Sequence, residues 1–372
     1  MLSSRPPLQI IVFADLADGD AKAFIDALDA AISSGKSAGG YVPSMDDLGI
    51  QFRRFNTNEI PLQTPGNLLE DFQHTVVVAL VSSGWIEKST PQFWAWLGEC
   101  WEKLLQSDGA NRVLPILLDE RAVRAFLEKH PALGALQTMA AHTLGETAIR
   151  PAMFALRVLH ECRLALASRL PVDPGTTRGY LRLFISHAKL DGLPLAQALK
   201  HQIAQIPWLK SFYDADDLTS GADWKKELEA AARSSIVVVL RSEIYDTRYW
   251  CQQEVLWSEE YATPTILVEL RTGMNHSAGS LPFDRAPTVR VADGNLFRIV
   301  FLAVREGLRF LYFMARVEEM KRSGELPKDA QLRVFCTAPA MPALLRACND
   351  LKPDPAALGA PRIILYPDPP LR

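Results

Sequence analysis

The sequence predicts an α/β protein built from parallel sheets covered by helices, and three observations support this fold class. Short apolar runs alternate with helical patterns along most of the 372 residues, as in parallel sheets with helices on both faces. One run, 75–81, is continuously apolar after its first residue, which is typical of a strand buried on both faces. The pattern then restarts near residue 181. We therefore expect two tandem domains of similar fold.

The first part of the chain carries a full set of these elements. We expect strands at 9–13, 52–55, 75–81 and 113–118 and helices at 20–32 and 152–167. The segment 171–177 contains two prolines and a glycine, which interrupt regular structure and are typical of a linker. We therefore place a first domain at 1–170 and a linker at 171–179.

The next part of the chain repeats this order of elements. Strands are expected at 181–185, 209–213, 236–240 and 265–270, and helices at 194–206, 224–234 and 250–261. The two parts align with residues 12–14 opposite 184–186 and with 76–80 opposite 236–240. The spacing between the copies varies along the chain, which indicates a duplicated fold and not a short-period repeat. The second domain is placed at 180–325.

A third copy starts near the end of the chain. Residues 332–336 resemble 181–185, and 363–368 resemble the run that ends the second strand. Only strand, helix and strand are present, and two strands do not close a core alone. The segment 326–372 is therefore a partial third α/β unit, which either docks on its neighbours or continues in a longer chain. We favour a chain truncated after Arg372.

Composition and charge exclude several classes of protein. With 48% hydrophobic and 22% charged residues, the chain is an ordinary globular protein and not a disordered one. Its 40 basic and 43 acidic residues give a net charge of −3, so direct nucleic-acid binding is not expected. The five cysteines are scattered and never spaced as C-x-x-C. This favours free thiols in a reducing compartment over disulfides or a zinc site.

The most apolar stretch, 296–315, is a candidate membrane span that its own charges exclude. It contains Arg298, Arg305, Glu306 and Arg309, and a central charge costs about 2.5–3.5 kcal/mol in a bilayer. We therefore interpret it as a buried helix. The N-terminus also lacks the layout of a signal peptide. We expect a cytoplasmic protein with no membrane partner.

Four motifs in the middle of the chain carry a specific signal. They are LFISHAKLD at 183–191, FYDADDLTSGADW at 212–224, IVVVLRS at 236–242 and YWCQQE at 249–254. In this order and spacing they resemble the Toll/interleukin-1 receptor (TIR) domain, in its bacterial NAD-consuming branch. One departure is Ser220, because the loop after the second strand of such domains (the BB loop) usually has proline before the glycine, here Gly221. That glycine still permits the turn.

The resemblance implies a fold, an activity and a setting. It implies tandem TIR-like (flavodoxin-like) domains, the first of them degenerate. It implies an NAD+ glycohydrolase that releases nicotinamide and ADP-ribose or a cyclic variant, with NAD+ as substrate, no separate cofactor and no metal. The setting would be bacterial anti-phage defence, with self-association through TIR domains and a sensor or effector protein as further partner.

The resemblance also assigns roles to individual residues. It makes Glu254 the catalytic residue. It implies a substrate-binding set composed of Ser186, His187, Ala188, Lys189, Asp214, Leu218, Ser242 and Trp250. His187 is expected to touch the substrate without being needed for catalysis.

The spacing of Trp250 and Glu254 agrees with this chemistry independently. Residues four apart on a helix share one face, so an indole and a carboxylate would lie side by side. Nicotinamide in NAD+ is already a cationic leaving group, so its release needs a carboxylate near the ribose and no metal. The loop 186–189 follows a strand and should lie at the carboxyl edge of the sheet, where ligands of such folds bind.

Other residues in this region have plainer interpretations. Asp214, Asp216 and Asp217 fit turn chemistry better than a cation site. Cys251 is expected to be a packing thiol, since no histidine stands near it in sequence. Neither a G-x-G-x-x-G nor a Walker pattern is present, which argues against a redox Rossmann domain and an NTPase.

The first domain lacks these features. Four residues after Trp94 stands Gly98, and Glu99 falls on a different helical face, so this copy is expected to be catalytically inert. The main alternative to an enzyme is a non-enzymatic adaptor that recruits other TIR domains. A third interpretation is transfer in place of hydrolysis, such as base exchange or deoxyribosyl transfer on the same sheet edge.

Overall fold

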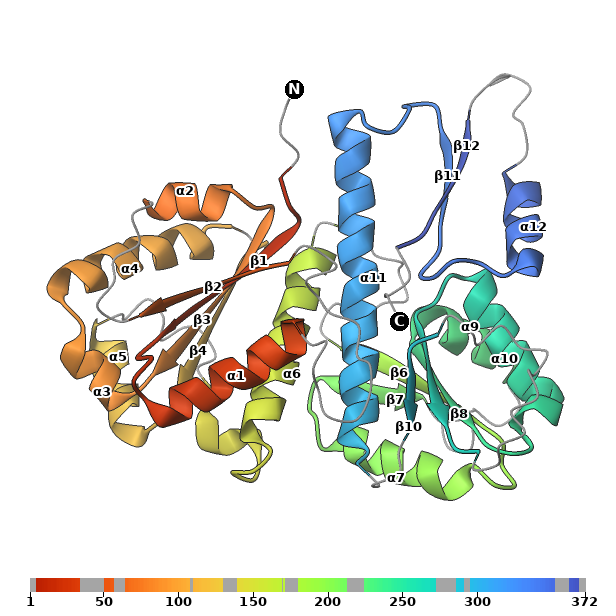
Figure 1. Cartoon of the computed structure of the whole chain (residues 1–372), viewed down its shortest axis with the longest axis horizontal. Helices are drawn as coiled ribbons and strands as arrows, with labels where there is room; N and C mark the ends of the chain where they lie inside the picture. The colour runs from red at the N-terminus through yellow and green to blue at the C-terminus, as the bar shows by residue number, and fades with distance from the viewer. Residues whose placement is uncertain are drawn as a thin grey trace. The chain divides into compact units, whose positions relative to one another are not determined.

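The computed structural model describes most of the chain as two compact units, residues 1–171 and 172–372. The described residues are 5–33, 50–56, 64–107, 110–129, 139–168, 170, 180–212, 224–271, 286–290, 295–351 and 361–367. The expected α/β class is confirmed, because each unit contains a five-stranded parallel sheet between helices (Figure 1). The two units are described separately below.

The N-terminal unit is organised around a sheet with the order β2-β1-β3-β4-β5. Its strands are β1 (Leu8–Ala14), β2 (Gln51–Asn56), β3 (His74–Val81), β4 (Arg112–Leu117) and β5 (Met139–Ala140). Every residue of β1 and β3 is buried, and for β3 this confirms the burial on both faces that the apolar run 75–81 predicts. The two-residue β5 was not predicted, because so short an edge strand leaves no periodic pattern in the sequence.

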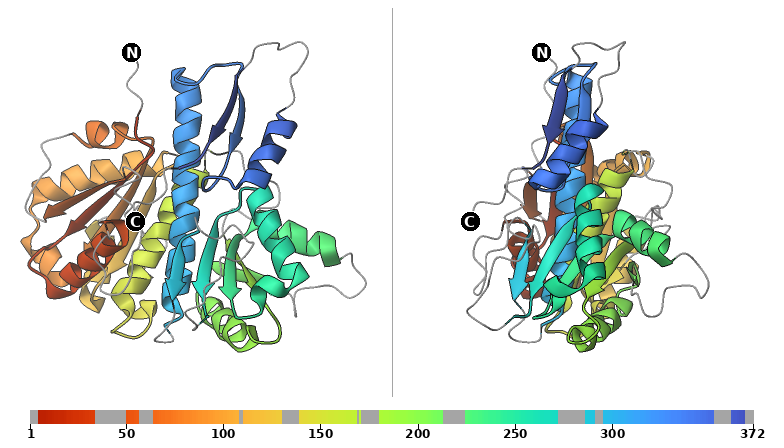
Figure 2. Two further views of the ribbon diagram at one scale, coloured as in Figure 1. Left: turned by 45° about the vertical axis from the view of Figure 1, so that its right-hand side comes forward. Right: turned by 90° about the vertical axis from the view of Figure 1, so that its right-hand side faces the viewer.

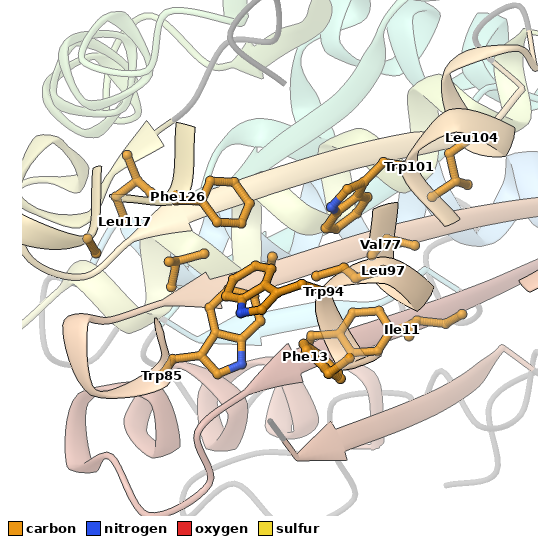
Figure 3. Close-up of a cluster of buried hydrophobic side chains, with 14 of the residues drawn as sticks. Ile11, Phe13, Val77, Trp85, Trp94, Leu97, Trp101, Leu104, Leu117 and Phe126 are labelled. Carbon is orange, nitrogen blue, oxygen red and sulfur yellow. The ribbon is translucent and has the colours of Figure 1, made fainter. Parts of the chain in front are cut away.

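Helices cover both faces of this sheet. They are α1 (Gly19–Ser33), α2 (Pro65–Glu70), α3 (Ser83–Lys88), α4 (Pro91–Leu105), α5 (Glu120–Lys129) and α6 (Arg150–Ala167), with a 3-10 turn η3 (Ala141–Leu144). Helices α1 and α6 pack together on one face, where the rings of Phe24 and Phe154 meet edge to face at 5.0 Å. On the other face, an aromatic cluster around Trp85 and Trp94 fills the space beneath α4 (Figure 3).

The second unit has the same strand order. Its sheet has the order β10-β9-β8-β6-β7. If its five strands are numbered 1 to 5 along the chain, from β6 to β10, the order from the β7 edge is 2-1-3-4-5. The strands are β6 (Leu181–His187), β7 (Leu209–Phe212), β8 (Ile236–Arg241), β9 (Thr265–Glu269) and β10 (Thr288–Arg290). The four predicted strands of this domain are confirmed, and β10 is again a short edge strand that was missed.

Two pairs of helices enclose this second sheet. Helices α9 (Trp224–Ser234) and α10 (Tyr249–Glu260) bury their apolar side chains on the face that carries Val237 and Val239. Helices α7 (Leu193–Ala204) and α11 (Phe297–Ser323) cover the opposite face, to which Ile236 points. Helix α11 approaches so closely that a Cβ on Gly307 would lie 2.5 Å from Cδ1 of Ile236. A larger residue at this crossing would require the end of the Ile236 side chain to move.

Three charged residues in the middle of α11, Arg305, Glu306 and Arg309, are buried, in agreement with the buried helix expected at 296–315. Arg309 donates to Oε1 of Glu306 at 2.5 Å and to the carbonyl of Cys336 at 2.8 Å. A buried arginine needs such partners, since an unpaired charge in the interior is costly. Among the described residues, no helix combines the length and apolar character required to cross a membrane.

The C-terminal segment forms a β–α–β unit that docks on α10. Strands β11 (Gln331–Val334) and β12 (Arg362–Leu365) pair in parallel, and α12 (Met341–Asp350) lies beside the end of α10 (Figure 2). Phe335 packs with Ala262, which follows α10, and Arg333 donates to the carbonyl of Glu260 at 2.5 Å. The segment thus closes its core against a neighbour and caps a helix C-terminus with a cation.

The two sheets share one further feature, which corrects the alignment of the copies. Phe13 on β1 pairs with Phe55 on β2, and their rings stack at 5.4 Å. Phe184 on β6 pairs with Phe212 on β7 at 5.5 Å. Phe13 therefore corresponds to Phe184, one residue away from the alignment of 12–14 with 184–186.

Candidate active site

The candidate site lies where the order of the second sheet reverses, at the carboxyl ends of β6 and β8. The chain leaves β6 towards β7 on one side and returns to β8 on the other, and ligands of open α/β sheets bind at such a point. Ser186 and His187 were expected in the loop after the strand. They are instead the last two residues of β6, paired with Val239 and Leu240 of β8. This pairing fixes their backbone.

Helix α10 supplies the second half of the site. Trp250 and Glu254 are one turn apart on it and both line the same cleft, as their spacing predicts. The side chain of Glu254 faces the cleft although the residue is only 6% exposed. A carboxylate this deeply buried needs hydrogen-bond donors.

Ser186 is one such donor. Its hydroxyl donates to Oε2 of Glu254 at 2.5 Å and lies 2.5 Å from the hydroxyl of Tyr245, in the 3-10 turn η4 (Tyr245–Thr247). Phe184 and Ser186 point to the same face of the sheet because side chains alternate along a strand. That face carries α10, which explains why a serine at the end of β6 meets a glutamate of this helix.

The cleft has a volume of about 840 Å³, within the range of small-molecule sites. Its walls come from the end of β6, from α9 and from the first turns of α10. The lining residues are His187, Ala188, Lys189, Leu190, Trp224, Leu228, Arg248, Tyr249, Trp250, Cys251 and Glu254.

Aromatic rings form one side of this cleft. The indole of Trp250 meets that of Trp224 at 4.2 Å between centroids and an angle of 67°. The ring of Tyr249 contacts Trp250 edge-on at 5.0 Å. Two cationic side chains, Lys189 and Arg248, also line the cleft. The site therefore combines flat apolar surfaces, positive charge and one buried carboxylate.

Burial sets the protonation of two neighbouring groups. It raises the pKa of the Cys251 thiol to about 12, with the charge of Glu254 adding to the effect. Burial, followed by the same charge, holds the pKa of Tyr245 well above its usual range. Cys251 therefore stays a thiol at neutral pH, and its Sγ points to the carbonyl of His187 at 3.5 Å. These properties agree with the packing role expected for Cys251.

Comparison with known proteins identifies the segment that contains this site. Residues 183–280 match the family model described as the TIR domain. This segment is a TIR domain. No curated protein matches the chain. Among solved structures, a candidate tagatose-6-phosphate ketose/aldose isomerase from Clostridium novyi NT is similar at 9% identity, with a TM-score of 0.20, over 87% of this chain and 82% of its own. A likeness this low carries no argument.

The TIR domain brings some of the predicted substrate-binding residues together and separates others. His187, Ala188, Lys189 and Trp250 line the cleft with Glu254. Ser186 lies on the side of Glu254 away from the cleft, and its hydroxyl donates a hydrogen bond to the Glu254 carboxylate. Asp214 and Leu218, with the rest of the BB loop, lie outside the described residues.

Ser242 takes part in a set of hydrogen bonds between two turns. Its hydroxyl donates to Asp191 at 2.6 Å, and the same carboxylate accepts from the backbone of Ile244 at 3.3 Å. These bonds tie the turn after β6 to the connection between β8 and α10. Ser242 is not among the residues that line the cleft of the TIR domain.

Sequence reasoning missed several residues of the site, among them Trp224, Tyr245, Arg248 and Tyr249. Trp224, Arg248 and Tyr249 stand in or beside the motifs that carry the resemblance, so their neighbourhood was a usable signal. Tyr245 had none. Its contact with Ser186 joins residues 59 apart in the chain, which only folding brings together.

Proposed function

We propose that the TIR domain cleaves the nicotinamide–ribose bond of NAD+ and releases nicotinamide with ADP-ribose or a cyclic variant of it. The observation that carries this proposal is Glu254, a carboxylate that is buried yet lines a ligand-sized cleft. Cleavage builds positive charge on the ribose, in an oxocarbenium-like transition state. A fixed carboxylate in a water-poor site stabilises such charge strongly, because little solvent screens it.

The bond changes follow from this arrangement. The bond between ribose C1′ and the pyridinium nitrogen breaks, and its electron pair neutralises the nicotinamide as it leaves. Water then attacks C1′ and loses a proton, which gives ADP-ribose. A cyclic product forms when another nucleophilic atom of the same ADP-ribose replaces the water. In either case Glu254 holds the ribose and faces the developing charge.

The remaining cleft residues suit the other parts of NAD+. The ring surfaces of Trp224, Tyr249 and Trp250 offer stacking partners for a flat heterocycle. Lys189 and Arg248 supply positive charge for a diphosphate. His187 and Ala188 contribute contacts beside Glu254 without a proton-transfer role.

For the whole protein, we propose a role in bacterial anti-phage defence, in which the TIR domain is activated by self-association or by a sensor protein. The rim of the cleft offers apolar surface for such contacts. Leu190 is 77% exposed and Tyr249 is 61% exposed. The competing hypothesis is an adaptor that acts only through these surfaces. That hypothesis assigns no role to the buried carboxylate of Glu254 in the cleft.

The two hypotheses are separated by incubating the protein with NAD+ at high protein concentration and measuring nicotinamide by chromatography. Glu254→Gln should lower turnover at least about a hundredfold, since it keeps size and polarity but removes the charge. Glu260→Gln, on the same helix but outside the cleft lining, is the matched control and should keep full activity. Full turnover by a folded Glu254→Gln protein would refute the enzymatic role of this residue. No turnover by the parent protein at any concentration would favour the adaptor.

A further inference from the structure

We propose that Tyr245 is a positioning residue that acts on Glu254 through Ser186. The inference rests on the proposed function and adds to it a second and a third side chain that prepare the catalytic carboxylate. The three groups form a continuous chain: the hydroxyl of Tyr245, Oγ of Ser186 and Oε2 of Glu254, with 2.5 Å at each step. Neither Ser186 nor Tyr245 is among the residues that line the cleft, so both act from behind it.

The order of donors along this chain follows from the number of protons. Ser186 has one hydroxyl proton, and it is donated to Glu254. The bond between Tyr245 and Ser186 must therefore use the proton of Tyr245. The alternative acceptor for Tyr245 is the carbonyl oxygen of Cys251. It lies 3.5 Å from the Tyr245 hydroxyl, which is a long distance for a hydrogen bond between two oxygens. Each hydroxyl thus donates towards the carboxylate.

This direction is what a negatively charged carboxylate favours. A hydrogen bond donated to the charged form stabilises it, and a second donor behind the first polarises the hydroxyl further. The effect is large where water is excluded, and Tyr245 and Ser186 are 0% and 1% exposed. Because burial keeps the pKa of Tyr245 well above its usual range, this hydroxyl remains a donor throughout the working pH range.

The turn that carries Tyr245 is held by its own ion pair. The guanidinium of Arg241, at the end of β8, donates to both carboxylate oxygens of Asp246. Its Nε lies 3.0 Å from Oδ1 and 3.2 Å from Oδ2. The amide of Gln252 on α10 donates to the carbonyl of Asp246 at 2.6 Å. Tyr245 is therefore fixed both to the sheet and to the helix that carries Glu254. A fixed donor chain holds one orientation of the carboxylate, which is the condition for preorganised catalysis.

Among the described residues, the other titratable and charged groups that line the cleft or act on Cys251 remain constant in the test below. They are His187, Lys189 and Asp191 from the end of β6 and its turn, and Arg248 and Cys251 from α10. Helix α9 contributes only Trp224 and Leu228 to the cleft. A change in pH dependence after alteration of Tyr245 or Ser186 therefore reports on the donor chain.

The decisive experiment is a double-mutant cycle with Tyr245→Phe and Ser186→Ala in the full chain. Each should lower kcat for nicotinamide release about tenfold, with KM within about twofold. The acidic limb of the pH–rate profile should move to higher pH, by about one unit for Ser186→Ala and less for Tyr245→Phe, because the charged form of Glu254 loses support. The double variant should be no slower than Ser186→Ala, since Tyr245 acts only through Ser186.

A matched control is Tyr312→Phe, which removes the same atom from another buried tyrosine, on α11 and outside the cleft lining. It should leave kcat and the pH profile unchanged. Additive losses in the cycle, or Tyr245→Phe with unchanged kcat and pH profile, would overturn the proposal. If Tyr245→Phe does not fold, as judged by circular dichroism, an unmoved acidic limb in Ser186→Ala overturns it equally.

A second readout does not depend on turnover. The carboxyl stretch of protonated Glu254 can be isolated in the infrared as the difference between the parent and Glu254→Gln proteins. Its titration should move to higher pH in Ser186→Ala and in Tyr245→Phe. If the parent protein releases no nicotinamide, the proposed function fails while this titration still decides the donor chain. An unshifted titration in both variants would refute it.

Discussion

The N-terminal unit and the TIR domain have sheets with the same strand order, but they carry different residues at the end of the first strand. Both have the strand order 2-1-3-4-5 and a stacked phenylalanine pair across their first two strands. Two residues after the phenylalanine of the first strand, the TIR domain has Ser186, which donates to a glutamate. The N-terminal unit has Asp15 there, paired with Lys88 at 2.6 Å. The TIR domain thus has a donor to a carboxylate where the N-terminal unit has a carboxylate.

A helix between the third and fourth strands, α10 in the TIR domain and α4 in the N-terminal unit, also differs between the two. In the TIR domain, α10 places Glu254 and Trp250 on a cleft. In the N-terminal unit, α4 places Trp94 against Trp85, with the centroids of the two indoles 5.3 Å apart (Figure 3). Phe93 of the same helix contacts Trp85 edge-on. Glu99 of α4 points away from this core and pairs with Lys103. The same strand order thus carries an aromatic core in the N-terminal unit and a cleft in the TIR domain, and the residues at the strand ends and on the neighbouring helix differ between them.

The largest effect is expected when the aspartate of the N-terminal unit, Asp15, is introduced at the matching position of the TIR domain. Ser186→Asp places a second carboxylate beside Glu254, in a position where Ser186 is almost fully buried. Turnover of NAD+ should fall about a hundredfold, because a donor is lost and a like charge is added. Repulsion and burial raise the pKa of one carboxyl of the pair. The loss of stability is therefore larger at pH 8 than at pH 5, and it disappears only below about pH 4, where that carboxyl is protonated in both the folded and the unfolded state.

The reciprocal change, Asp15→Ser, is the control for this swap. It removes the partner of Lys88 and should destabilise the N-terminal unit by about 1 kcal/mol, the scale of a partly exposed ion pair. Turnover should not change. A fall in turnover with Asp15→Ser would mean that the N-terminal unit takes part in the reaction.

A second test compares the tryptophans of the two helices. Trp94→Ala should cost about 3–5 kcal/mol of unfolding free energy in the N-terminal unit, since the indole is buried among aromatic rings. It should leave turnover unchanged. Trp250→Ala should lower turnover about tenfold, with a smaller loss of stability, because one wall of the cleft disappears. Calorimetry and nicotinamide release measure the two effects. The comparison would break if the effects were exchanged.

The smallest expected effect concerns cysteine reactivity. Burial raises the pKa of Cys100 on α4 and of Cys251 on α10 to about 12, so roughly one molecule in 10⁴ carries either thiolate at pH 8. Iodoacetamide should label exposed Cys348 first. Labelling of the two buried thiols should rise with pH towards 12. Peptide mapping by mass spectrometry measures these rates, and labelling of Cys251 as fast as that of Cys348 at pH 8 would contradict the assignment.

Much of the fold could be predicted because burial leaves a local pattern. Strands β3 and β8 are buried on both faces and read as continuous apolar runs, and α10 presents Trp250 and Glu254 on one face through simple helical periodicity. The edge strands β5 and β10 were missed. They have two and three residues and are held mainly by pairing with a longer neighbour.

The sequence by itself determined the fold class, the position of the TIR domain and the pairing of Trp250 with Glu254, because each depends on residues close together in the chain. Tertiary structure alone decided that Ser186 lies behind Glu254 and not in the cleft, that Ser242 bonds Asp191, and that Asp15 corresponds to Ser186. It also brought in Tyr245. Such contacts join residues about 50 to 70 positions apart, and their geometry depends on strand register and on how a helix packs on its sheet.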